Sequence, residues 1–266
     1  MIESFRRIDR APLVVERSDV ESRRFGLSVA RLNVPLASSV RDDEIVQVCK
    51  ETEHDVVVVR YPTDRARVAE LFARCDDVIS FQVDTLVYFS LKVGSRPALI
   101  LPSTDYRIRP AIVADREDLS ALFGASFTNY TSHYAANPIF KEQDIRDGYI
   151  EWATSYLEQA SFETLLARTK SDAISGFITM KVDPDVAELI LSGVHPTYHG
   201  QGIYTGLVDH ALNVGQLHGV GEVVTSTQVS NFRVIRSWIR AGFTLECSLN
   251  TIHVMRRQSL PYSDSD

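Results

Sequence analysis

The sequence predicts a mixed α/β protein made of two units, and three observations support this fold class. Short runs of β-branched and aliphatic residues alternate with stretches of helical periodicity. Turn-forming residues gather at 94–105 and separate two such patterns. Near residue 200, a glycine-containing loop joins a strand to a helix, as in a crossover connection. We predict an N-terminal αβ domain over residues 1–100, a larger α/β domain with a mixed sheet over 106–257, and a flexible tail over 258–266.

The N-terminal unit is expected to alternate strands with helices. Residues 55–61 are rich in valine, which favours a strand. Residues 40–51 carry apolar side chains at helical spacing. In chain order, the predicted elements are a strand over 21–34, a helix over 40–51, a strand over 55–61, a helix over 64–74 and a long alternating strand over 78–93.

The C-terminal unit begins with an alternating run over 106–113 that predicts a strand. Two helices follow, near residues 115–123 and over 144–159, each with apolar or aromatic side chains along one side. The remaining predicted elements are strands over 163–169, 175–182 and 187–194, a helix over 202–218, a strand over 222–228, a helix over 230–241 and a final hairpin-like pair.

Composition excludes several classes of protein. The chain has 28 Lys and Arg residues against 35 Asp and Glu, so its formal charge of −7 disfavours a general nucleic-acid binder. The longest aliphatic run, residues 56–59, is too short to cross a membrane, and no secretion signal is visible. Cys49, Cys75 and Cys247 are widely spaced and form no C-x-x-C pair. We therefore expect a cytoplasmic protein with reduced thiols and no disulfide framework.

Residues 194–204 carry the chemistry that the sequence predicts most specifically. A glycine-containing loop that leads into a helix leaves several backbone N–H groups without partners, and with the helix dipole they suit a pyrophosphate. Gly200 and Gly202 would let the phosphate approach these amides closely. The spacing fits neither a Rossmann fingerprint nor a P-loop. A tight turn without a ligand is the alternative, but Gly193 and Pro196 also predict that the preceding strand parts from its neighbour here.

This loop resembles the acyl-CoA loop of the GNAT superfamily of N-acyltransferases, through Val194-His195-Pro196-x-x-His199-Gly200-x-Gly202-Ile203. Asn231, Trp238 and the run 241–243 resemble the second cofactor motif of that family. The resemblance covers about residues 106–255 and implies a GNAT-like acyltransferase domain with a splayed central strand. It also implies that acetyl-CoA is the acyl donor. The implied cofactor-binding residues are Val194, His199, Gly200, Gln201, Gly202, Ile203, Tyr204, Asn231 and Trp238.

Two positions depart from the family pattern. His199 stands where a basic or Gln side chain is usual, and Tyr204 stands where a small residue is common. Neither change removes the main-chain donors, although both would alter the fit to the adenosine diphosphate. Tyr204 is equally compatible with simple packing on the helix.

Shorter patterns resemble a narrower subgroup of nucleotide-linked amino-sugar N-acetyltransferases, which includes TDP-fucosamine acetyltransferase. They are Glu21-Ser22-Arg23-Arg24-Phe25-Gly26, interpreted as an entry strand, then Ser132-His133-Tyr134-x-x-Asn137-Pro138 and Tyr149-Ile150-x-Trp152. This resemblance implies an amino-sugar acceptor. Because His133, Tyr134 and Asn137 surround Pro138 in a predicted loop, we place them at the mouth of the substrate site.

The implied reaction is direct attack by a neutral amine on the thioester in a ternary complex. We predict Glu188 as the base, because it matches the family's catalytic Glu and lies six residues before Val194, which in a regular strand places both side chains on one face. A structural role for Glu188, with a water chain as the base, is the alternative. Members commonly place an acidic Tyr where this chain has Trp238, whose indole cannot release a proton. Tyr130, Tyr134 and His133 are the other candidates for protonating the thiolate.

Two further functions are compatible with the sequence: a peptide or protein Nα-acetyltransferase, and a non-catalytic acyl-CoA-binding module. Because Pro196 separates His195 from His199, we expect no metal site there. The N-terminal unit would either close over the acceptor amine or form a homodimer through an exposed edge of the strand at 78–93.

Overall fold

The computed structural model describes residues 12–37, 39–95, 105–126 and 132–257. The predicted tail over 258–266 lies outside these ranges. The strands in chain order are β1 (Glu16–Arg17), β2 (Val29–Asn33), β3 (Val56–Pro62), β4 (Val78–Lys92), β5 (Tyr106–Pro110), β6 (Phe162–Thr169), β7 (Ile174–Val182), β8 (Val186–Val194), β9 (Glu222–Gln228) and β10 (Thr244–Arg256). The α-helices are α2 (Asp19–Phe25), α3 (Asp42–Lys50), α4 (Arg67–Ala73), α5 (Arg116–Ser126), α6 (Glu142–Ser155), α7 (Ile203–Leu217) and α8 (Phe232–Ala241).

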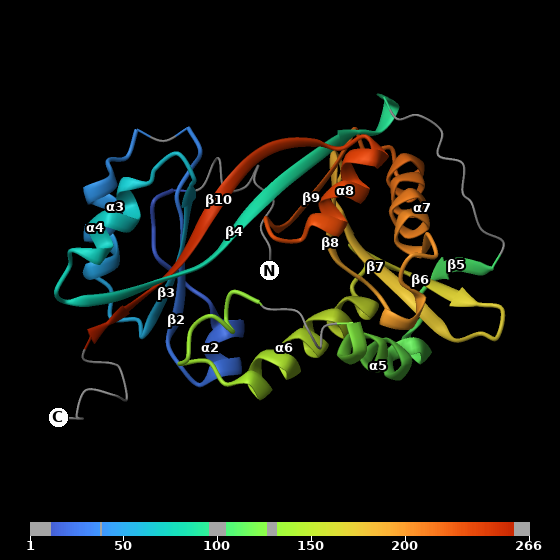
Figure 1. Ribbon diagram of the computed structural model, residues 1–266, viewed down its shortest axis with the longest axis horizontal. Coiled ribbons are helices and arrows are strands. Elements are labelled where there is room, and N and C mark those ends of the chain that lie inside the picture. The colour runs from blue at the N-terminus through green and yellow to red at the C-terminus, as the bar shows by residue number, and fades with distance from the viewer. Residues whose placement is uncertain (1–11, 38, 96–104, 127–131, 258–266) are drawn as a thin grey trace.

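In the described part of the chain all ten strands form one mixed sheet, in the order β1-β2-β3-β10-β4-β9-β8-β7-β6-β5. The pairs β2–β3 and β8–β9 are parallel and the others are antiparallel. The long strands β4 and β10 lie at its centre and join the N-terminal strands to the rest (Figure 1). The mixed α/β class predicted from the sequence is confirmed.

One prediction about these central strands is wrong: residues 244–256 form one long strand where a hairpin-like pair was expected. β4 pairs with β10 from Val78 to Ser90, but with β9 only from Leu86 to Lys92. A homodimer through the edge of the strand at 78–93 therefore stays a prediction. The sheet also crosses the predicted boundary between 1–100 and 106–257, since β4 precedes it and both of its neighbours follow it. The division into two domains stays a prediction.

The predicted strand over 21–34 is also wrong in its first half. Residues Asp19–Phe25 form α2, and the strand β2 begins only at Val29. Acidic side chains in the first turn of α2 and arginines in its last turn interact favourably with the helix dipole and so stabilise the helix. Gly26 then ends the helix in a left-handed conformation, with φ of 64°. The run 21–26 is therefore helical and is not an entry strand.

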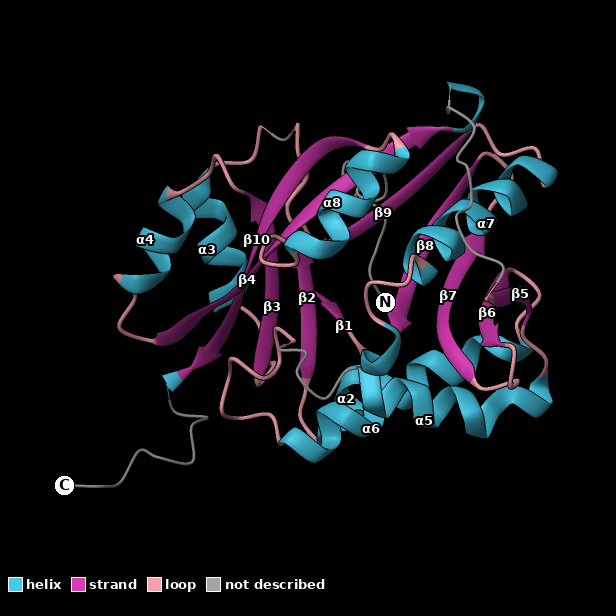
Figure 2. Ribbon diagram, turned by 45° about the vertical axis from the view of Figure 1, so that its right-hand side comes forward, coloured by secondary structure: helices cyan, strands magenta, loops and turns pink. Residues whose placement is uncertain are grey.

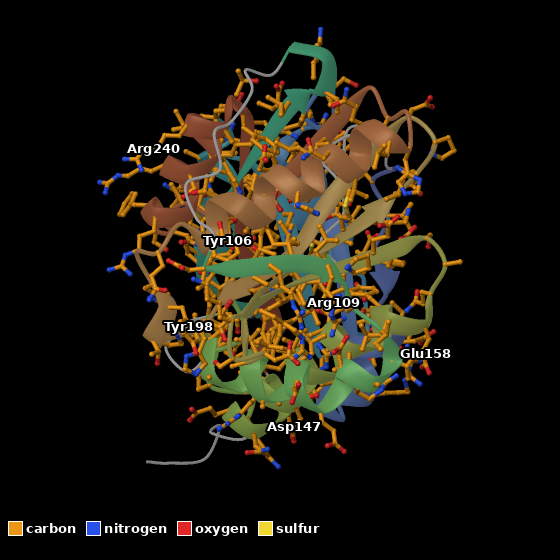
Figure 3. The ribbon with its side chains drawn as sticks, turned by 90° about the vertical axis from the view of Figure 1, so that its right-hand side faces the viewer. Tyr106, Arg109, Asp147, Glu158, Tyr198 and Arg240 are labelled. Carbon is orange, nitrogen blue, oxygen red and sulfur yellow. The ribbon has the colours of Figure 1, made fainter. Side chains whose placement is uncertain are left out.

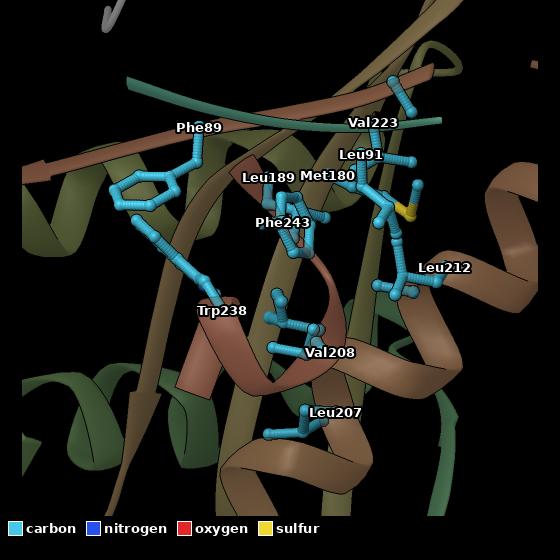
Figure 4. Close-up of a cluster of buried hydrophobic side chains, with 14 of the residues drawn as sticks. Phe89, Leu91, Met180, Leu189, Leu207, Val208, Leu212, Val223, Trp238 and Phe243 are labelled. Carbon is cyan, nitrogen blue, oxygen red and sulfur yellow. The ribbon is translucent and has the colours of Figure 1, made fainter. Parts of the chain in front are cut away.

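Helices cover both faces of the sheet. α3 and α4 pack on the N-terminal strands, and α7 and α8 pack on the same face at the other end, over the apolar side chains of β4, β7 and β8. α2, α6 and α5 follow one another along the opposite face (Figure 2). This second face carries the cavity described below. Figure 4 shows the core under α7 and α8, where Trp238 packs edge-on against Phe89 at a centroid distance of 5.5 Å.

Candidate active site

The central feature of the site is a gap between β8 and β9. The two strands pair in parallel only from Val186 to Leu189 on β8. Beyond Leu189, β8 continues along β7 to Val194, whereas β9 continues along β4 to Gln228. The predicted splay is therefore present. A cavity of about 520 Å³ is lined by both diverging strands, at 189–192 and 225–228, and extends over the face covered by α2 and α6.

A β-bulge at Ile190 changes the geometry expected for Glu188. Leu189 and Leu191 pair with consecutive residues of β7, so Ile190 is the extra residue of β8. Glu188 pairs with Lys181, and Val194 pairs with Gly176. Lys181 and Gly176 are an odd number of positions apart on β7, so these positions face opposite sides of the sheet. The side chains of Glu188 and Val194 therefore lie on opposite faces, and the expectation of one shared face is wrong. Val194 packs with the α7 and α8 core.

The Glu188 side chain is on the cavity's face of the sheet, although it is not on the cavity wall itself. Burial is the main cause that raises the pKa of Tyr88 and of Tyr156, and the nearby negative charge of Glu188 raises both further. Tyr156 lines the cavity. The carboxylate is thus within electrostatic reach of the space where an acceptor would bind.

The loop before α7 has the main-chain geometry of an anion nest. Gly200 and Gly202 both adopt left-handed conformations, with φ of 79° and 76°, which explains why glycine occupies both positions. Gly200 and Gln201 are exposed. In the described residues, no hydrogen bond engages the backbone N–H groups of Gly200 to Tyr204, and three of them belong to the loop before the helix. The donors of Gly200 and Gln201, at the exposed start of the loop, therefore suit an anion such as the diphosphate of coenzyme A.

Side chains around this loop hold its shape. The imidazole Nε2 of His199 lies 3.0 Å from the Val194 carbonyl, so His199 ties the loop to the end of β8. The Tyr106 hydroxyl donates to the Gly202 carbonyl at 3.3 Å and lies where a Cβ on Gly206 would be. Figure 3 shows Tyr106 on β5 beside α7, with Tyr198 at the outer edge of the molecule. The sequence did not predict the part played by Tyr106.

Trp238 and Tyr204 form one hydrogen-bonded unit beside the gap. The Trp238 Nε1 donates to the Tyr204 hydroxyl at 3.0 Å, and the Ser192 hydroxyl donates to the same oxygen at 3.4 Å. Burial raises the pKa of Tyr204 to about 12, so its phenol stays protonated. Ser192, Asn231 and Trp238 line the cavity. Asn231 precedes α8, and its amide donates to Thr227 on β9 at 3.0 Å.

The predicted substrate residues do not all lie at an open mouth. His133 and Tyr134 are buried but line the cavity. Asn137 is only 1% exposed and is not on the cavity wall. Its amide contacts the ring of His253 and Met255, and its oxygen accepts the backbone N–H of Ile139. The placement of Asn137 at the mouth is wrong, because its polar groups are used to hold the 132–140 segment on β10.

A buried ion pair that the sequence did not predict fixes Tyr134. Two nitrogens of Arg31 donate to Glu21, each at 2.7 Å, and the Tyr134 hydroxyl donates to the same carboxylate. Burial alone would raise the pKa of Glu21, but the charge and hydrogen bonds of Arg31 outweigh it and lower the pKa to about 2. Because its hydroxyl proton is engaged by Glu21, Tyr134 is poorly placed to protonate a thiolate.

His133 is held by a second buried histidine. The Asn137 amide donates to Nδ1 of His253, so Nε2 of His253 carries the proton that is shared with Nδ1 of His133 at 2.9 Å. Burial lowers the pKa of His133 well below 6.5 and that of His253 to about 3. Both rings are therefore neutral at pH 7, and His133 is not a proton donor to a thiolate. The remaining candidate, Tyr130, lies outside the described residues.

Within the described ranges, no group of three or more His, Cys, Asp or Glu side chains is placed to hold a metal ion. In the same ranges, no helix is both long enough and apolar enough to cross a membrane.

Comparisons with known proteins agree with this geometry. Residues 127–243 match the model of the acetyltransferase (GNAT) family. The chain is 25% identical over 209 residues to the spore coat polysaccharide biosynthesis protein SpsD of Bacillus subtilis, covering 76% of this chain and 67% of that protein. A GCN5-related N-acetyltransferase from Sphaerobacter thermophilus has a similar fold, with a TM-score of 0.64, 16% identity and coverage of 94% and 78%. A functionally unknown conserved protein from Staphylococcus epidermidis also shares the fold, with a TM-score of 0.60, 11% identity and coverage of 92% of each chain. Residues 127–243 are therefore similar to the acetyltransferase (GNAT) family, and the fold of the chain is that of solved GNAT structures.

Proposed function

We propose that this protein transfers the acetyl group of acetyl-CoA to the amine of a small molecule, most specifically a nucleotide-linked amino sugar. The observation that carries the proposal is the gap between β8 and β9, which opens onto the cavity and leads along β8 to the loop whose Gly200 and Gly202 have left-handed conformations. The diphosphate of the donor would bind the amides. Its pantetheine arm would satisfy the unpaired edges of the parted strands.

The reaction is direct attack in a ternary complex. Acetyl-CoA supplies the thioester, whose carbonyl carbon forms a bond to the amine nitrogen while its bond to sulfur breaks. The nitrogen then loses its second proton to solvent, and coenzyme A leaves as the thiolate, which takes up a proton from solvent to give the free thiol. The ammonium form of the acceptor must first lose a proton, and Glu188 on the cavity's face of the sheet is the residue we assign to this step. A water chain from Glu188 would span the remaining distance, since its carboxylate is not on the wall.

Tyr204 is the residue we assign to the leaving thiolate. Its hydroxyl oxygen accepts from Trp238 and Ser192, which leaves its own proton for another acceptor beside the gap. With its pKa near 12, this phenol is a much weaker acid than a thiol, whose pKa is about 8.5. Tyr204 would therefore stabilise the thiolate by donating a hydrogen bond, without complete proton transfer.

Two observations support an amino-sugar acceptor. SpsD, a relative over most of the chain, is named for polysaccharide biosynthesis. The cavity wall also carries Tyr149, Trp152 and Tyr156, and such aromatic faces pack well against sugar rings and nucleobases. His133 and Tyr134 would contact the same acceptor from the other side.

The direct test is release of free thiol from acetyl-CoA in the presence of nucleotide-linked amino sugars. We expect turnover, and we expect Glu188→Gln to lower kcat by roughly 10²- to 10⁴-fold if the carboxylate is the base. Glu117→Gln, which changes an exposed glutamate on α5, is the matched control and should keep wild-type kcat. Turnover on peptides alone would contradict the acceptor class. Tight acetyl-CoA binding without consumption by any amine would contradict the enzymatic proposal.

A further inference from the structure

The cavity floor contains a row of polar side chains that the reaction described above does not use. Arg60 on β3 is directly opposite Thr251 on β10, and Thr251 is directly opposite Asp84 on β4. Asn33 on β2 extends the row, as the parallel partner of Arg60. Residues at paired positions project from the same face of a sheet, so all four lie on one face. Asn33, Arg60 and Asp84 line the cavity.

Among the described residues, Arg60 is a buried charge that forms no ion pair. Its side chain interrupts a strand of valines, and the residue is only 3% exposed. In the described part of the chain, Nε and Nη1 of Arg60 have no hydrogen-bond partner, and no carboxylate lies within ion-pair distance. By contrast, the nearby Arg31 is paired with Glu21 at 2.7 Å. An unpaired buried charge is strongly unfavourable, so an anion that enters the cavity would gain affinity from pairing with Arg60.

Asp84 places a negative charge at the end of this polar row that lies farther from β2. Its Oδ1 is buried and has no hydrogen-bond partner within the described residues, and its Oδ2 accepts from Gln228 at 3.5 Å. Gln228 is the last residue of β9 and lies at the gap where the thioester is expected. Because one strand separates β3 from β4, the main chains of Arg60 and Asp84 are about 10 Å apart. The floor is therefore positive at the far end of the cavity and negative beside the gap.

We propose that the acceptor amine also carries an anionic group, a phosphate or a carboxylate, which Arg60 binds while Asp84 holds the ammonium group beside the thioester. Reversed binding would place like charges together at both ends, so the floor fixes one orientation of the acceptor. This inference rests on the proposed function. It states which group of the acceptor is recognised, such as the phosphate of a nucleotide-linked sugar, and it assigns Arg60 to that anion and Asp84 to the ammonium group.

The first experiment measures binding by calorimetry on the full chain saturated with CoA, so that the anion nest before α7 is occupied. The probes are three forms of one amino sugar: the neutral methyl glycoside, the 1-phosphate and the uronic acid. We expect one anionic form to bind at least tenfold more tightly than the neutral form, and the stronger of the two identifies phosphate or carboxylate as the recognised group. Equal affinity for all three forms would overturn the inference.

Arg60→Met and Arg31→Met form a matched pair, since both remove a guanidinium from this face of the sheet. We expect Arg60→Met to abolish the preference for the anionic form and to leave or raise the Tm of the ligand-free protein, because an unpaired charge is removed. Arg31→Met should lower the Tm, because it leaves Glu21 buried and unpaired. Retention of the anion preference in Arg60→Met would overturn the inference, as would a fall in Tm equal to that of Arg31→Met.

Asp84→Asn tests the other end of the row. We expect it to raise KM for the amine by roughly tenfold at unchanged KM for acetyl-CoA, and an unchanged KM for the amine would contradict the role of Asp84. The binding experiments do not depend on turnover. Absence of acetyl transfer with every amine would thus contradict the proposed function alone, whereas equal binding of the three probes contradicts only the present inference.

Discussion

The donor side and the acceptor side of the cavity are built from different parts of the chain. On the proposed donor side, the groups that would bind are main-chain amides of one short loop, shaped by Gly200 and Gly202. On the proposed acceptor side, they would be buried side chains joined over long sequence separations, such as Tyr134 with Glu21 and His133 with His253. A main-chain site can be kept while neighbouring side chains change. A side-chain site changes with every substitution, so acceptor specificity can diverge while the donor stays the same.

The largest effect is expected from a substitution that changes the backbone conformation of the loop before α7. A matched control then separates the effect on acetyl-CoA affinity from the effect on stability. Gly202→Val places a β-branched residue at a φ of 76°, which costs about 1–3 kcal/mol and moves the amides that would bind the diphosphate. We expect the Kd for acetyl-CoA to rise by roughly 100-fold, as two hydrogen bonds to a charged group are lost. Calorimetry with acetyl-CoA measures this directly.

Gly219→Val is the matched control, because Gly219 has nearly the same φ, 74°, at the other end of α7. It should lose similar stability in urea unfolding and keep the wild-type Kd. If both variants lose acetyl-CoA affinity equally, the donor site depends on the stability of the helix and the contrast between the two sides is wrong.

The same contrast explains what the sequence could predict. The donor loop was recognised because its signals are local: glycines, a proline and the start of a helix within about ten residues. The gap beyond Leu189 agrees with the predicted splay of the strand, whereas the binding of acetyl-CoA by the loop stays a prediction. The pairing of Arg31 with Glu21 and of His133 with His253 has no local signal, since it depends on how α2 and the segment around residue 133 pack on the strands β2 and β10. Arg60 did carry a signal, as a lone charge within a buried valine-rich strand, but its significance needs the cavity.

Errors in the expected elements have similar physical causes. The bulge at Ile190 adds one residue to β8 and reverses the alternation on which the position of Glu188 was argued. The strand predicted over 21–34 overlaps α2, whose helix signals are the acidic first turn and Gly26 at its end. The sequence predicts a hairpin-like pair where β10 is one strand, because the length of β10 depends on β3 and β4, which lie far away in sequence.

The second prediction concerns acid sensitivity of the acceptor side. His133 and His253 have folded-state pKa values below 6.5, so only the unfolded chain takes up these protons as the pH falls. Stability should therefore fall from pH 6.5 toward 3, by up to about 1.4 kcal/mol per pH unit for each histidine. Glu21 adds a second loss: its pKa is about 2 when folded against 4.5, so about 3 kcal/mol present above pH 4.5 disappears as the pH falls to 2.

Urea unfolding at a series of pH values tests this directly. His133→Gln removes one of the two histidines, so it should reduce the slope below pH 6.5, while the additional loss that Glu21 causes below pH 4.5 should remain. A wild-type profile that is flat between pH 6.5 and 4.5 would contradict the burial of neutral histidines on the acceptor side.

The smallest effect is expected where the two sides meet, at the hydrogen bond from Trp238 to Tyr204. Trp238→Phe keeps an aromatic ring against Phe89 but removes the indole N–H, so stability should fall by about 1 kcal/mol. If Tyr204 donates to the leaving thiolate, the freed hydroxyl will be less well oriented, and kcat should fall severalfold at nearly constant KM for acetyl-CoA. Tyr204→Phe removes the hydroxyl itself and should lower kcat at least as much. Because both changes act through one hydroxyl, the double variant should be no slower than Tyr204→Phe alone. Additive losses in kcat would show that Trp238 acts by packing and that Tyr204 has no part in orienting the thiolate.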